Sequence, residues 1–176
     1  MNKRILESSV FYLFFIVIAF FVNAHTDFNI TKLSKILPLT EILLYSISTA
    51  LLIVLITFVL NRRSSFFRHI EIEFSKLILP ISVQNTFFIS SFSAIGEELI
   101  FRGIFFQQFG FFFSSILFGS IHFIPQKEFY PWTLFAICLG FILGGLFSIT
   151  GSIVAPIVCH FLINFINILI IRHKFS

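Results

Sequence analysis

The sequence predicts an all-α fold, a polytopic transmembrane helix bundle with about six spans. Hydrophobic residues make up 57% of the 176 residues, charged residues make up only 11%, and the mean hydropathy is +1.01. A soluble domain carries about 25% charged residues, so this composition is typical of an integral membrane protein. Each span needs about 20 residues, which leaves room for about six helices. We therefore expect residues 1–176 to form a single transmembrane domain.

Six apolar segments can be assigned in order along the chain. They cover residues 9–24, 40–60, 77–109, 111–124, 131–149 and 152–171. The first segment follows Lys3 and Arg4 and ends at Val-Asn-Ala, residues 22–24, a pattern that also fits a signal peptide loosely. We expect this segment to be a retained span, because every later segment already commits the chain to the membrane.

The third segment is too long for one straight span. We expect a break or kink near residues 93–96, Ser-Ala-Ile-Gly, because small residues weaken a helix there. Glu97 and Glu98 would then lie near the first turn of the following helix, where the helix dipole stabilises negative charge. A single tilted helix is the alternative.

The basic residues predict the orientation of the bundle in the membrane. One loop carries Arg62, Arg63, Arg68 and Lys76, and a six-span arrangement places Lys3, Arg4, Lys127, Arg172 and Lys174 on the same side. Only Lys32 and Lys35 fall on the opposite side. By the positive-inside rule, both termini are expected in the cytoplasm, provided that the third segment crosses the membrane only once. The net charge of +4 suits anionic lipid headgroups, and the sequence contains no nucleic-acid-binding motif.

Ionisable side chains inside apolar segments are costly, so they indicate a functional site. Residues four apart share a helical face, which predicts that Glu98 pairs with Arg102. Glu97 points to another face and has no partner nearby in the sequence, which suits a general base or acid. The alternative is that Glu97, Glu98 and Arg102 form a salt-bridge cluster that only packs helices together.

Two further pairs place polar groups on single helical faces. His122 follows Phe118 by four residues, and Asn164 follows His160 by four. Either histidine alone is equally well explained as a hydrogen-bonded core residue. Facing helices in a bundle lie about 8–10 Å apart, so these groups and Glu97 can converge on one cavity.

The residues present exclude most known chemistries for cutting peptides inside a membrane. An aspartyl mechanism needs two intramembrane aspartates, and the sole aspartate is Asp27, in a loop. The zinc-binding H-E-x-x-H string is absent. A serine mechanism with Ser120 and His160 would leave the glutamates unexplained. A glutamate-dependent mechanism remains.

Three ordered motifs resemble those of the CAAX protease and bacteriocin-processing family, also called CPBP or Abi intramembrane proteases. They are E-E-x-x-x-R at residues 97–102, F-x-x-x-H at residues 118–122 and H-x-x-x-N at residues 160–164. The resemblance implies a catalytic core over residues 77–171, preceded by variable spans over residues 1–76. It also implies an intramembrane endopeptidase in the inner (plasma) membrane of a bacterium, with membrane lipid and a membrane-associated protein or peptide substrate as partners and no nucleic acid.

The same resemblance implies a role for each motif residue. Glu97 and His122 would activate a water molecule, and His160 and Asn164 would donate hydrogen bonds to the oxyanion. Glu98, Arg102 and Phe118 would support them. A metal-dependent mechanism would instead use Glu97, His122 and His160 as ligands of one divalent ion such as Zn, with an open position for water. The same polar residues are also compatible with a non-catalytic immunity or scaffold protein of this fold, and with a transporter or proton channel.

Overall fold

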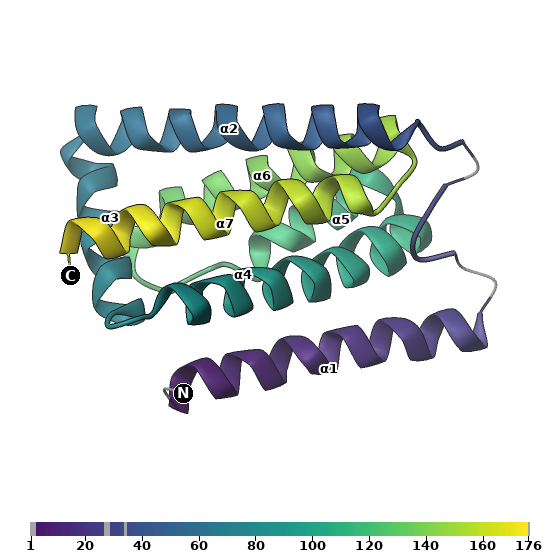
Figure 1. Cartoon of the computed structure of the whole chain (residues 1–176), viewed down its shortest axis with the longest axis horizontal. Helices are drawn as coiled ribbons and strands as arrows, with labels where there is room; N and C mark the ends of the chain where they lie inside the picture. Colours follow the sequence, from purple (N-terminus) through teal and green to yellow (C-terminus); the bar gives the residue numbers. More distant parts are fainter. Residues whose placement is uncertain (1–2, 27–28, 34, 176) are drawn as a thin grey trace.

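The computed structural model describes residues 3–26, 29–33 and 35–175, which form a bundle of helices (Figure 1). The elements are α1 (Lys3–His25), α2 (Leu39–Arg63), α3 (Ser65–Ile78), α4 (Val83–Glu98), the π-helix η1 (Leu99–Phe105), α5 (Phe106–Ser120), the 3₁₀-helix η2 (Lys127–Phe129), α6 (Tyr130–Thr150) and α7 (Val154–Phe175). The all-α membrane bundle predicted from the sequence is confirmed.

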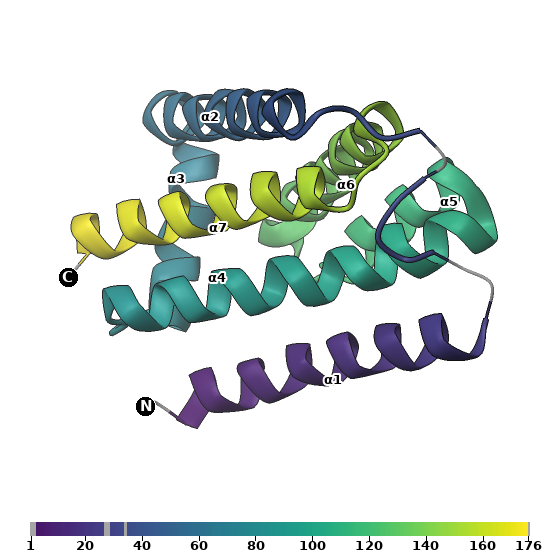
Figure 2. The same ribbon diagram turned by 45° about the vertical axis from the view of Figure 1, so that its right-hand side comes forward.

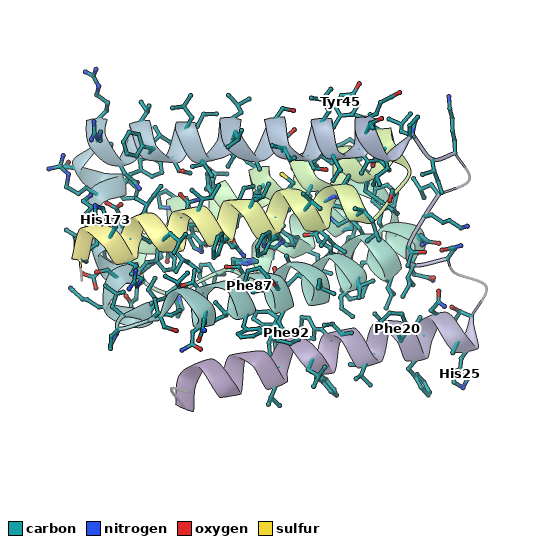
Figure 3. All side chains as sticks on the ribbon, in the orientation of Figure 1. Phe20, His25, Tyr45, Phe87, Phe92 and His173 are labelled. Atoms are coloured by element: carbon teal, nitrogen blue, oxygen red, sulfur yellow. The ribbon has the colours of Figure 1, made fainter. Side chains whose placement is uncertain are left out.

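Four helical stretches of the described chain are long and apolar enough to cross a membrane. They are Leu39–Arg63, Val83–Ser120, Lys127–Thr150 and Val154–Phe175, and α1 adds the shorter apolar stretch Val10–His25. Large apolar side chains are exposed on the outside of the bundle, for example Phe20, Tyr45 and Phe87 (Figure 3). This surface suits contact with lipid rather than water.

The stretch Val83–Ser120 is a hairpin of two helical limbs. The backbone leaves the helical region at Gly110, where φ is +81° and ψ is 176°. The ring centroids of Phe101 and Phe118 lie 5.3 Å apart, whereas 17 residues of straight helix would separate them by about 25 Å. The chain therefore reverses at Gly110, the position that separates the third and fourth predicted spans. The second limb, residues 111–120, is about 15 Å long and reaches only halfway across a hydrocarbon core of about 30 Å.

The predicted break near residues 93–96 is wrong. Helix α4 continues through these residues to Glu98, which is itself helical with φ −66° and ψ −37°. Glu97 and Glu98 are thus the last two residues of α4, and η1 follows them directly. The expectation that a helix N-terminal dipole stabilises their charge is therefore also wrong. A Cβ atom at Gly96 would lie 2.9 Å from the Tyr12 carbonyl oxygen, which shows that this glycine serves close packing of α1 on α4.

The third predicted span also begins too early. Its first residues belong to α3, a separate amphipathic helix that carries charged residues and ends at Ile78. Helix α4 starts only after Ser82, whose hydroxyl accepts a hydrogen bond from the Asn85 backbone amide. The predicted boundary between residues 76 and 77 therefore falls inside α3.

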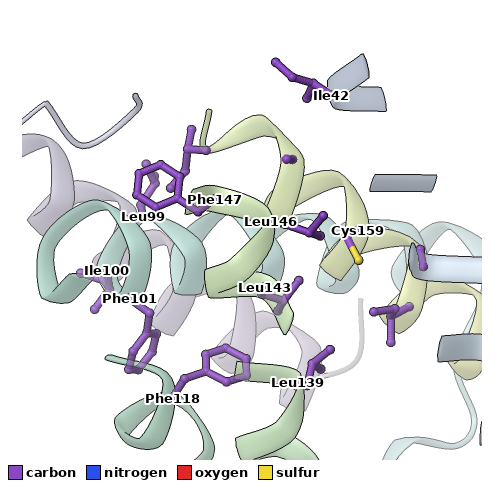
Figure 4. Close-up of a cluster of buried hydrophobic side chains, with 14 of the residues drawn as sticks. Ile42, Leu99, Ile100, Phe101, Phe118, Leu139, Leu143, Leu146, Phe147 and Cys159 are labelled. Carbon is purple, nitrogen blue, oxygen red and sulfur yellow. The ribbon is translucent and has the colours of Figure 1, made fainter. Parts of the chain in front are cut away.

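The helices are arranged so that α4 and α7 lie at the centre of the bundle. Helix α1 packs on the outer side of α4, α7 lies between α4 and α2, and α6 packs against α5 (Figures 1 and 2). Helix α3 crosses the end of the bundle at which both chain termini lie (Figure 1). The apolar core around Phe101, Phe118, Leu143 and Phe147 fills the space between η1, α5 and α6 (Figure 4).

Candidate active site

Glu97 and His122 face each other although 25 residues separate them. Glu97 Oε2 lies 3.7 Å from His122 Nε2, because the hairpin at Gly110 brings His122, two residues after the end of α5, back to the end of α4. His122 Nδ1 donates a hydrogen bond of 2.8 Å to the Phe118 carbonyl oxygen, one helical turn earlier. In the neutral ring, Nε2 is consequently an acceptor that points at the carboxylate.

The carboxylate atom in this pair is buried and has no hydrogen-bond partner among the described residues. Two acceptors, Glu97 Oε2 and His122 Nε2, cannot bond each other, but one water molecule can donate a hydrogen to both. Their separation of 3.7 Å permits a hydrogen bond of about 2.8 Å from one oxygen to each atom. The pair can therefore hold a water molecule by both of its hydrogens, which leaves the oxygen lone pairs free.

The second glutamate anchors a fully buried polar network. Arg102 Nη1 donates to Glu98 Oε1 at 2.9 Å, as the spacing of four residues predicts, and Arg102 Nη2 donates to the Gly140 carbonyl oxygen at 2.8 Å. His160 Nδ1 lies 2.8 Å from Glu98 Oε1 and donates to it. The Phe118 ring lies 4.4 Å from the guanidinium carbon. Glu98 thus fixes both Arg102 and the orientation of the His160 ring.

Asn164 lies one turn after His160 on α7, and its Nδ2 donates a hydrogen bond of 3.2 Å to Ser93 Oγ on α4. Glu97, His122, His160 and Asn164 all line one cavity of about 310 Å³. The residues that the sequence predicts for the site, which come from three separate segments, are therefore brought together. Glu98 and Arg102 lie behind this cavity, and Phe118 is part of its wall.

Two residues of the site are not predicted by the sequence motifs. Tyr12 on α1 lines the same cavity, and its hydroxyl group interacts with the Glu97 carboxylate. Nothing in the sequence marks Tyr12, because the aromatic residue lies in an ordinary apolar segment. Ser93 precedes Glu97 by four residues and therefore shares its helical face, a signal that could have identified it.

The predicted metal ligands Glu97, His122 and His160 are not grouped as one three-residue cluster in the described part of the chain, and the metal-dependent alternative stays a prediction. No three His, Cys, Asp or Glu side chains are grouped to hold a metal ion within residues 3–26, 29–33 and 35–175. Glu97 and His122 approach each other, and the bond of His160 Nδ1 to Glu98 leaves Nε2 as the only nitrogen of that ring that could bind a metal ion.

Comparison with known proteins identifies the family. The family described as type II CAAX prenyl endopeptidase Rce1-like matches residues 79–166, half of the chain. The chain belongs to this family. The match begins before α4, ends in α7 and includes Glu97, His122, His160 and Asn164, whereas Tyr12 lies outside it. The membership confirms the resemblance stated from the three motifs.

Among curated proteins, the chain is similar to the uncharacterized protein YpbD of Bacillus subtilis (strain 168). The two are 29% identical over 91 residues, which is 51% of this chain and 47% of the relative. The chain thus spans about half the length of this curated relative. No solved structure gives a significant match.

Proposed function

We propose that this integral membrane protein is an intramembrane endopeptidase that hydrolyses a peptide bond of a membrane-associated protein or peptide. The observation that carries the proposal is the pair Glu97 and His122, two hydrogen-bond acceptors 3.7 Å apart in a shared cavity. Membership in an endopeptidase family supports the same reaction class. A bacterial inner membrane, predicted from the resemblance, is the proposed location.

In the proposed mechanism, Glu97 and His122 bind the nucleophilic water and remove a proton as its oxygen attacks the scissile carbonyl carbon. The carbonyl C=O bond becomes a C–O⁻ single bond in the tetrahedral intermediate. When the C–N bond breaks, the same proton passes to the leaving nitrogen, so the products are a carboxylic acid and an amine. Tyr12 interacts with the Glu97 carboxylate and would help to orient it toward the water.

The proposed oxyanion donors are Asn164 and His160. Asn164 has two N–H hydrogens, and its bond to Ser93 uses one, so the second is available for the oxyanion. His160 can donate from Nε2 when its ring is protonated, and the Glu98 carboxylate on Nδ1 compensates that charge. Removal of one oxyanion donor typically costs about 2.7–4 kcal/mol of transition-state stabilisation.

The test is to map new peptide termini after the purified protein is reconstituted with a membrane proteome. The unmodified protein should create termini that are absent from a parallel incubation with Glu97→Gln. The Gln side chain has nearly the same shape, so this variant is the matched control. Identical sets of termini from both proteins would refute the proposed function.

A further inference from the structure

The cavity extends well beyond the four residues of the proposed reaction, and a second set of polar groups lines its far part. Thr57 and Asn61 contribute from α2, and Asn167 contributes from α7. Asn167 follows Asn164 by three residues and His160 by seven, so all three lie along one face of α7. At 1.5 Å per residue, Asn167 lies about 4.5 Å beyond Asn164 along the helix axis. Family membership does not account for this residue, because the match ends at residue 166.

Among the residues that the structure describes, the Asn167 amide has a partner at one end only. Its Oδ1 lies 3.1 Å from Thr57 Oγ1 across the contact between α2 and α7, and Thr57 Oγ1 also lies 2.9 Å from the Val54 carbonyl oxygen. A side-chain amide offers two donor hydrogens and a carbonyl oxygen, and one contact leaves most of this capacity unused. At membrane depth, an amide that faces a cavity needs a polar partner, because an unsatisfied amide costs several kcal/mol in hydrocarbon.

The charge of the cavity restricts what that partner can be. No Lys or Arg side chain lines the cavity in the described part of the chain, whereas the carboxylates Glu71 and Glu97 do. Glu71 is already paired with Lys174. An anionic partner, such as a lipid phosphate or a peptide C-terminal carboxylate, would therefore meet negative charge without a compensating Lys or Arg.

Most of the remaining lining is apolar, and α3, α6 and α7 contribute most of it. It includes Phe67, Ile70, Phe74, Trp132, Phe135 and Leu139. One polar strip opposite apolar walls matches an extended peptide, which presents main-chain amides along its length and side chains to alternate faces. An extended chain rises about 3.3 Å per residue, so the spacing of about 4.5 Å corresponds to one or two residues.

We propose that Asn167, held by Thr57, is a substrate-binding residue that hydrogen-bonds the main chain of the peptide one or two residues from the scissile bond. The subsite takes a neutral, interior segment with apolar side chains and disfavours an anionic C-terminus. This inference rests on the proposed function for the identity of the bound molecule as substrate. Thr57 is the positioning residue of the subsite, because its hydroxyl group orients the Asn167 amide.

The experiment measures peptide binding in a protein that cannot turn over. Glu97→Gln is reconstituted in lipid nanodiscs and titrated with fluorescein-labelled decapeptide pools that carry apolar central residues and end in either a carboxylate or an amide. Asn167→Ala in this background should weaken binding of the amide pool about tenfold, the effect of one or two lost hydrogen bonds. Thr57→Val, which keeps the side-chain shape, should weaken it less. Asn85→Ala is the matched control, because Asn85 does not line the cavity.

Binding of the amide pool at least as tight as that of the carboxylate pool is expected. The subsite is overturned if Asn167→Ala and Thr57→Val both bind like Asn85→Ala, if neither pool binds, or if the carboxylate pool binds more tightly. A third outcome separates the two proposals: Asn167→Ala loses binding, but the unmodified protein cleaves no substrate. This result would refute the proposed function and support the peptide-binding subsite. In an active protein, Asn167→Ala should raise KM and leave kcat nearly unchanged, because the contact exists before the transition state.

Discussion

Replacement of the two adjacent glutamates by glutamine should have different effects. Glu98→Gln should lower the stability of the fold, whereas Glu97→Gln should remove the activity. Glu98 and Arg102 are both fully buried, and Glu98 is the carboxylate to which Arg102 and His160 are bonded. Glu98→Gln removes that charge and leaves a buried guanidinium without its anion. Breaking a buried pair in this way costs about 3–5 kcal/mol, a large part of the roughly 5–15 kcal/mol that stabilises a typical fold.

Glu97→Gln should leave the fold intact and stop the reaction. Its Oε2 atom has no hydrogen-bond partner among the described residues. Removal of the charge therefore breaks no hydrogen bond at this atom and lowers the desolvation cost of the buried carboxylate. The Gln side-chain oxygen can still accept a hydrogen bond from the Tyr12 hydroxyl group, and we expect a change of less than about 1 kcal/mol in the free energy of unfolding. Loss of the general base should lower kcat by about 10²- to 10⁴-fold.

Both variants are measured in the same detergent by denaturant unfolding, and in vesicles by cleavage of a mapped substrate. The expected result is a stable, inactive Glu97→Gln and an unstable Glu98→Gln whose remaining folded fraction keeps partial activity. Unchanged kcat in Glu97→Gln would remove the general-base assignment. Equal free energies of unfolding for the unmodified protein and Glu98→Gln would show that the buried network is not what holds these helices.

Three further predictions concern α1, the hairpin and the orientation. Tyr12→Phe should lower kcat about tenfold with KM and stability little changed, whereas Tyr45→Phe on the exposed face of α2 should behave like the unmodified protein. Gly110→Ala should reduce the free energy of unfolding by about 1–3 kcal/mol because of its positive φ, and Gly145→Ala, where a Cβ also meets nothing within 4 Å, should cost less. Reporter fusions should place residues 62–76 in the cytoplasm; a periplasmic signal would overturn the orientation.

The sequence was sufficient for the parts of the site that depend on local spacing. The pairing of Glu98 with Arg102 follows from their separation of four residues, and the structure contains it. The contact between His160 and Glu98 joins residues 62 positions apart, so it depends on how α7 rotates against α4. No pattern within one helix specifies that rotation, and for this reason the sequence predicts only Arg102 as the partner of Glu98.

Small residues were the main source of error in the fold. The Ser and Gly residues at positions 93 and 96 predict a helix break, but Ser93 bonds Asn164 and Gly96 admits the α1 backbone. A glycine that bends a chain and one that lets a neighbour approach have the same sequence signal, and only tertiary contacts distinguish them. The sequence analysis did not predict helix α3, because spans were assigned from continuous apolar segments and α3 contains several charged residues.

The contacts of Arg102 couple the assembly of four helical segments. Its guanidinium bonds Glu98 at the end of α4, stacks on Phe118 in α5 and donates to the Gly140 carbonyl oxygen of α6, while Glu98 also receives His160 from α7. An assembly intermediate that lacks any one of these helices leaves a polar group exposed to hydrocarbon. Docking of α5, α6 and α7 onto α4 should therefore be cooperative. In incompletely assembled chains, the unpaired Arg102 should destabilise the bundle and make such chains more susceptible to degradation.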